Sequence, residues 1–132
     1  MEKELENFIV KNWEETGFGK KYDLITENGE LISQQYTTDI GSIDILAKDK
    51  VSGSYVVIEL KKDQTSDATI GQLFRYMGWI KENKKDKNVK GVIVAGKYDE
   101  KLGYALKAVM DKTAVEIFLY EVDFKLKEYS KW

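Results

Sequence analysis

The sequence contains no cysteine and no histidine among its 132 residues. The lack of cysteine excludes a disulfide framework and thiolate chemistry, and the lack of histidine removes the commonest general base and the usual zinc ligand. Any catalytic chemistry must therefore use carboxylates, lysine, hydroxyls, amides or a metal ion that prefers oxygen ligands.

The sequence also lacks a long hydrophobic run. No apolar stretch approaches the roughly 18 residues that a membrane helix needs, and the N-terminal M-E-K-E-L-E is too charged for a signal peptide. We therefore expect a soluble, intracellular, cytoplasmic protein with no membrane contact. The net charge of −2 does not predict nucleic-acid binding, so a basic patch would have to be local.

The composition that remains is that of a globular protein, with 42% hydrophobic and 33% charged residues. A chain of this length is most simply one domain, spanning residues 1–132, and it is long enough to bury a substantial core.

The hydrophobic periodicity predicts alternating helices and strands. Leu5, Phe8, Ile9 and Trp13 form the apolar stripe of a first helix that ends near Gly17–Gly19, with Glu6 off that stripe. Asn28-Gly29 and the K-V-S-G of residues 50–53 predict turns. Strands are expected at 31–36, 41–48, 55–61, 89–95 and 115–122, and helices at about 65–82, with Thr65, Ser66 and Asp67 as N-cap candidates, and at 100–112. This order predicts an α/β fold with a mixed central sheet flanked by helices.

The stretch Y-V-V-I-E-L-K-K, residues 55–62, is typical of a strand buried on both faces, yet it contains Glu59 and Lys61. Side chains two residues apart share a sheet face, so these two charges lie together. A hairpin turn centred on Val51-Ser52 places Asp44 directly opposite Glu59. Two carboxylates and an ammonium are thus expected at one spot.

Such a pair of carboxylates needs a partner. At a separation of roughly 5 Å and an effective dielectric of about 20, they repel by on the order of 3 kcal/mol, which Lys61 relieves only in part. A divalent cation is the natural partner, and oxygen ligands favour Mg²⁺ or Mn²⁺ over zinc. A solvated ion pair on an edge strand is the alternative that this motif alone leaves open.

The helix after this strand carries a polar and aromatic stripe. Gln72, Tyr76 and Trp79 are spaced i, i+4 and i+7, with Arg75 beside them. We expect this stripe to lie opposite the apolar one, which consists of Ile70, Leu73, Met77 and Ile80.

Three motifs in this order carry a resemblance to a known family: G-S-I-D-I-L-A, V-V-I-E-L-K and G-Q-L-F-R-Y-M-G-W. The chain resembles the PD-(D/E)xK nuclease superfamily, in its RecB-like branch, and is similar to the C-terminal nuclease domain of archaeal and actinobacterial mismatch-specific endonucleases. The likeness extends over most of residues 4–96. It implies a restriction-endonuclease-like α-β-β-β-α-β core, here with an added C-terminal helix and strand.

The resemblance implies roles for individual residues. Asp44 and Glu59 match the metal-binding acids, Lys61 matches the lysine that orients or activates water, and Glu6 matches an acid that completes the metal shell. Gln72 and Tyr76 match the helical motif that supports the site and the bound DNA.

We therefore expect a Mg²⁺- or Mn²⁺-dependent deoxyribonuclease, an endonuclease that is structure-directed or weakly specific. Asp44, Glu59, Glu6 and the carbonyl of Leu60 are the expected ligands, and Lys61 stabilises developing charge. Arg75, Lys62 and Tyr76 are the expected DNA contacts. A homodimer and a separate DNA-targeting protein are left open as partners. The N-terminal domain of the mismatch endonucleases is absent from this sequence, so mismatch specificity is not expected.

Two other functions remain open. One is a non-catalytic nucleic-acid-binding or protein-interaction module on the same fold, which the acidic net charge favours and the clustered acids oppose. The other is an unrelated α/β protein in which Glu59 and Lys61 form a plain ion pair. In that protein, Asp44 would lie far from Glu59.

Overall fold

The computed structural model describes residues 2–64, 67–109 and 114–121 of the chain, and side chains are described within these ranges except at 63 and 64. The elements are α1 (Glu2–Lys11), η1 (Trp13–Glu15), α2 (Gly17–Lys21), β1 (Tyr22–Leu24), β2 (Thr26–Glu27), β3 (Glu30–Leu31), β4 (Gln34–Thr38), β5 (Gly41–Asp49), β6 (Tyr55–Gln64), α3 (Asp67–Asn83), β7 (Lys90–Lys97), α4 (Glu100–Lys107) and β8 (Val115–Leu119). None of the described helices is both long enough and apolar enough to span a bilayer.

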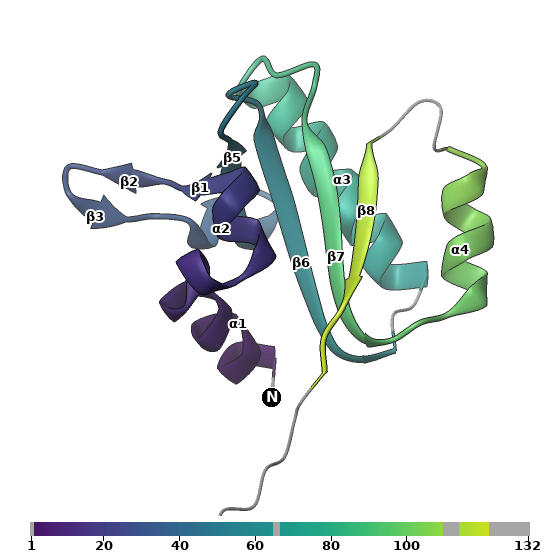
Figure 1. Cartoon of the computed structure of the whole chain (residues 1–132). Coiled ribbons are helices and arrows are strands. Elements are labelled where there is room, and N and C mark those ends of the chain that lie inside the picture. The colour runs from purple at the N-terminus through teal and green to yellow at the C-terminus, as the bar shows by residue number, and fades with distance from the viewer. Residues whose placement is uncertain (1, 65–66, 110–113, 122–132) are drawn as a thin grey trace, which may run out of the picture.

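A mixed sheet forms the middle of the molecule (Figure 1). Its strands follow the order β1-β5-β6-β7-β8, and β4 also pairs with β5. The β5–β6 pair is antiparallel, whereas β6–β7 and β7–β8 are parallel. The β2–β3 hairpin forms a separate two-stranded ribbon that projects from the body. The mixed α/β architecture predicted from the sequence is thereby confirmed.

Helices cover both faces of this sheet, and alternate residues of β6 serve the two cores. Val57 packs with α3 and with Leu102 of α4, whereas Val56 and Ile58 pack with side chains of α1, η1 and α2. Each of these strand residues is fully buried, and burying one such side chain contributes roughly 1.5–3 kcal/mol. The central strand is therefore fixed from both sides.

The β5–β6 hairpin has the predicted register. Lys48 pairs with Tyr55, and the ladder continues to Ile45 and Ile58. The Asn28-Gly29 turn is also confirmed, because both residues have positive φ, 53° and 82°, as a tight two-residue hairpin turn requires.

The N-terminal helix is shorter than predicted, because α1 ends at Lys11 rather than near Gly17. The side chains of Asn12 and Thr16 donate to the carbonyls of Phe8 and Trp13, which ends the regular helix. The following turns bury Trp13 instead, whose indole N–H donates to the Tyr22 carbonyl at 2.9 Å.

The other element boundaries shift by a few residues. The strand expected at 31–36 is divided into β3 and β4, because the buried Ser33 lies between them and accepts a hydrogen bond from the Ile25 amide. The strand β1 was not predicted. Helix α4 extends to Lys107 and β8 to Leu119, and the predicted ends at 112 and 122, with the N-cap candidates Thr65 and Ser66, lie outside the described residues.

Two glycines of α2 provide a matched test of how closely this helix packs against η1. A Cβ at Gly19 would lie 2.8 Å from the Glu14 Cα and overlap the Trp13 carbonyl, whereas a Cβ at Gly17 meets nothing within 4 Å. We expect Gly19→Ala to lower the free energy of unfolding by about 1–3 kcal/mol through overpacking. Gly17→Ala should change it by less than about 1 kcal/mol. Urea unfolding measures both values, and equal effects would contradict the packing described here.

Candidate active site

The candidate site lies where β5 and β6 separate. Beyond the Ile45–Ile58 pair, the ladder gives way to side-chain bonds: the Asp44 amide donates to Glu59 Oε2 at 3.0 Å, and the Leu60 amide donates to Asp44 Oδ2 at 2.9 Å. The two acids thus face each other across the hairpin, as predicted. An unrelated fold with these acids far apart is excluded.

Glu59 is the buried member of the acid pair, with only 2% exposure. Its Oε2 accepts the Asp44 amide, but its Oε1 is buried and finds no hydrogen-bond partner within the part of the chain that the structure describes. Burial, reinforced by the negative charge of Asp44, raises the pKa of Glu59 to about 8. A carboxylate held in this way favours either a proton or a cation.

Glu6 of α1 approaches the same place and is buried, with 2% exposure. Its position off the apolar stripe of the first helix therefore does not leave it exposed to solvent. Its carboxylate accepts hydrogen bonds from the amides of Gln34 and Gln35, at 2.8 and 2.5 Å, and from the Lys3 ammonium at 2.9 Å. Three polar groups thereby replace the water that this carboxylate loses on burial.

Gln35 connects Glu6 to the acid pair. Its Nε2 also donates to Asp44 Oδ1 at 3.2 Å, so that one side-chain amide lies between carboxylates from α1 and β5. Neither Gln34 nor Gln35 was predicted to be a site residue. Their position in an expected strand was visible, but nothing in the amino-acid type indicated contact with a helix 28 residues away.

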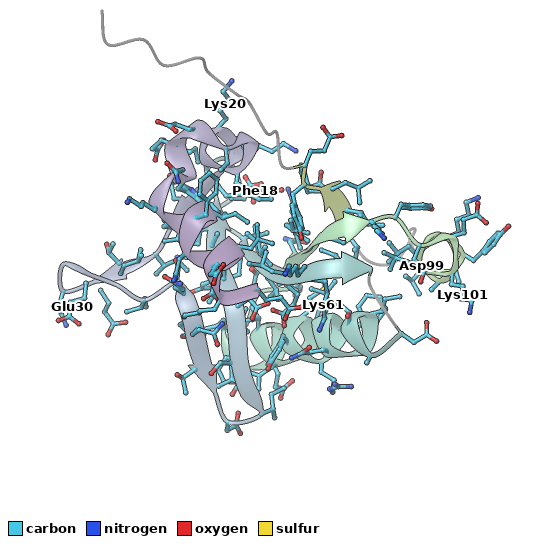
Figure 2. The ribbon with its side chains drawn as sticks, turned by 90° about the horizontal axis from the view of Figure 1, so that it is seen from below. Phe18, Lys20, Glu30, Lys61, Asp99 and Lys101 are labelled. Carbon is cyan, nitrogen blue, oxygen red and sulfur yellow. The ribbon has the colours of Figure 1, made fainter. Side chains whose placement is uncertain are left out.

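Leu60 and Lys61 continue β6 at the site. The Leu60 amide points to Asp44, and the carbonyl of the same strand residue points to the same side, which places it toward the gap between β5 and β6. Lys61 is half-buried (Figure 2), and its Nζ lies 3.9 Å from Glu2 Oε2. Its positive charge lowers the pKa of Glu59, but burial and the charge of Asp44 raise that pKa by more.

Helix α3 packs on the Glu59 face and carries the remaining predicted residues. Tyr76 is 5% exposed and belongs to the same core cluster as Leu73 and Met77, so the prediction that it lies opposite the apolar stripe is wrong. The reason is Gly41, where a Cβ would overlap the Tyr76 hydroxyl; the missing side chain makes room for the ring. Tyr76 thus supports the start of β5, while Gln72 is half-buried on the same helix.

The predicted phosphate-contacting cations are on the surface. Arg75 is exposed on α3, and Lys62 is exposed at the end of β6, where its amide donates to Glu2 Oε2 at 3.3 Å and its carbonyl accepts from the Tyr120 hydroxyl. Both positions leave the side chains accessible from solvent.

The donor set fits a divalent cation with oxygen ligands. Asp44 and Glu59 meet at the gap, the strand geometry directs the Leu60 carbonyl toward it, and Glu59 Oε1 has no hydrogen-bond partner among the described residues. Within the described ranges, no three Asp or Glu side chains are already gathered closely enough to hold a metal ion. Glu6 and Asp44 accept hydrogen bonds from the same Gln35 side-chain amide, which lies between them.

Comparisons with known proteins place the chain in one family. The family model described as the endonuclease NucS C-terminal domain matches residues 2–113. Endonuclease NucS of Methanocaldococcus jannaschii is 36% identical over 73 residues, which cover 55% of this chain and 27% of that protein. Endonuclease NucS of Sulfolobus acidocaldarius is 33% identical over 94 residues, which cover 71% of this chain and 33% of that protein.

Solved structures share the fold. A repair endonuclease from Pyrococcus abyssi superposes with a TM-score of 0.71 and 25% identity, over 92% of this chain and 47% of that chain. An EndoMS-dsDNA2 complex gives a TM-score of 0.71 at 22% identity, over 94% of this chain and 46% of that chain. The matches thus span about a third of the length of the two curated relatives and about half of the solved chains.

The raised pKa of Glu59 predicts how stability depends on pH without metal. The folded protein binds this proton more tightly than the unfolded chain, whose pKa is about 4.5, so the stabilisation is complete below about pH 4.5 and is lost as the pH rises to about 8. In EDTA, the free energy of unfolding of the wild type, relative to Glu59→Gln, should fall by on the order of a few kcal/mol over this range. Urea unfolding from pH 5 to 9 measures it, and a constant difference would contradict the burial of an unpaired Glu59 carboxyl.

Proposed function

Because this chain belongs to the family of endonuclease NucS C-terminal domains, we propose that it is a metal-dependent nuclease domain that hydrolyses phosphodiester bonds of DNA. The observation that carries the proposal is the pair of acids at the opened β5–β6 ladder, each bonded to the backbone of the opposite strand. One structural relative is a repair endonuclease and another was solved as a complex with dsDNA, which supports DNA as the substrate.

The finer family assignment follows from the same residues. Asp44 on β5, Glu59 and Lys61 on β6, and Gln72 on α3 occur in the order of the PD-(D/E)xK superfamily motifs, with the Gln-x-x-x-Tyr helix of its RecB-like branch. We assign the domain to this superfamily and its restriction-endonuclease-like core. The mixed sheet with α1 and α3 on opposite faces supports this assignment.

In the proposed mechanism, Asp44, Glu59 and the Leu60 carbonyl would hold Mg²⁺ or Mn²⁺, and Glu6 is linked to Asp44 through the Gln35 amide. The bound cation supplies activation of a water molecule and offsets the negative charge that develops on the phosphate. Lys61, whose ammonium lies 3.9 Å from Glu2 Oε2 and whose charge acts on Glu59, would stabilise the developing oxyanion. Arg75 and Lys62 provide exposed positive charges for the DNA backbone.

The buried Glu59 carboxyl is the reason that this site would favour a bound cation. Its carboxyl favours a proton up to about pH 8 because it is buried beside Asp44. A divalent cation would provide the positive charge that these two carboxylates lack, and Glu59 would bind it in the deprotonated form. Metal affinity should accordingly increase with pH through this range.

A cleavage assay tests this function. We expect Asp44→Asn, Glu59→Gln and Lys61→Met each to reduce Mn²⁺-dependent cleavage of DNA by at least about 100-fold while the far-UV spectrum stays unchanged. The substrate panel consists of linear, nicked, flapped, junction and mismatched DNA.

The matched control is Glu30→Gln, an exposed acid at the β2–β3 hairpin that lies well apart from Lys61 in Figure 2, and it should cleave as the wild type does. Undiminished cleavage by Glu59→Gln would show that the activity does not come from this site. A wild-type domain that neither binds Mn²⁺ nor cuts any of the substrates would instead support the non-catalytic binding module.

A further inference from the structure

The side-chain amide of Gln35 occupies the space between two carboxylates that come from different elements. Its Nε2 donates to Glu6 Oε1 of α1 at 2.5 Å and to Asp44 Oδ1 of β5 at 3.2 Å. We propose that Gln35 is a positioning residue that joins Glu6 to the Asp44–Glu59 pair and sets the geometry in which these acids receive a divalent cation. The inference rests on the metal-dependent function proposed above.

The backbone at Gln35 is unusual and is needed for this contact. Its φ is 50°, in the left-handed region that non-glycine residues seldom adopt. Consecutive side chains of a strand normally point to opposite faces, yet Gln34 and Gln35 both donate to the Glu6 carboxylate, one to each oxygen. The left-handed residue breaks the alternation of β4 opposite Asp44, between the Gln34–Ile45 and Tyr36–Ile43 pairs.

The chemistry of the amide suits this position. Glu6 and Asp44 are both acceptors when ionised, so without a donor between them they would repel each other and separate. A neutral amide draws both carboxylates toward one nitrogen without adding the fixed charge that would compete with a metal ion. Outer-shell hydrogen bonds of this kind orient metal ligands and tune metal affinity.

Gln34 offers the matched control. It carries the same side chain on the adjacent residue and donates to the same acid, at Glu6 Oε2, but its second bond is to Asn7 Oδ1 and not to Asp44. A residue that only stabilises Glu6 or β4 would act alike at both positions. A residue that connects the acids would act only at position 35.

The experiment measures Mn²⁺ affinity by isothermal titration calorimetry for the intact chain and three variants. We expect Gln35→Leu to weaken Mn²⁺ binding by about 10-fold or more, and Gln34→Leu to weaken it by less than about 3-fold. Gln35→Gly separates the amide from the backbone, because glycine accepts the left-handed φ, and it should lose as much affinity as Gln35→Leu.

A second readout is the melting temperature with and without metal. Gln35→Glu replaces the donor between Glu6 and Asp44 by a further carboxylate, so in EDTA this variant should melt at a lower temperature than the wild type. Saturating Mn²⁺ should then raise its melting temperature by more than it raises that of the wild type. A purely structural contact would lower the melting temperature without this extra gain from metal.

The outcomes are distinguishable. The positioning role would be overturned if Gln35→Leu and Gln35→Gly bound Mn²⁺ as tightly as the wild type, or if Gln34→Leu lost as much Mn²⁺ affinity as Gln35→Leu. The metal-dependent function would remain in place. A wild type that binds no Mn²⁺ would overturn the function and the positioning role together.

Discussion

The site depends on one exchange of hydrogen bonds between β5 and β6. At the end of their ladder, the Asp44 carboxylate accepts the Leu60 amide and the Glu59 carboxylate accepts the Asp44 amide. Each acid is thus fixed by the backbone of the strand opposite it, so neither can turn away to solvent. Two acidic groups are held together where repulsion would otherwise separate them, and this is the state that a divalent cation relieves.

The fold makes this exchange possible by fixing β6 from both faces. Val57 and Glu59 face α3, while Val56 and Ile58 face the N-terminal helices. Because Glu6 belongs to α1 and Gln35 to the edge strand β4, the site combines elements that contact one another only in the folded domain. Groups supported in this way by packed helices and strands keep a defined geometry without a bound ligand.

The sequence was sufficient for the parts of the site that follow local rules. The position of Asp44 opposite Glu59 follows from the period of two in strands and from the turn chemistry of residues 50–53. The burial of Glu6 does not follow, because its partners are amides on a distant strand and a helical pattern assigns such a residue to the surface. The left-handed φ of Gln35 is a property of the tertiary structure, since no glycine or asparagine marks that position. Tyr76 likewise became a core residue because Gly41, 35 positions earlier, leaves space for its ring.

A crystal of the domain grown with Mn²⁺ would reveal whether Asp44 and Glu59 bind one divalent cation jointly. Anomalous diffraction locates the ion independently of any assumption about its ligands. We expect an anomalous peak within about 2.0–2.4 Å of one carboxylate oxygen from each acid, with Glu59 Oε1 among the ligands of the ion. A fully occupied Mn²⁺ site elsewhere, with the Asp44 and Glu59 carboxylates unchanged and no ion between them, would contradict it.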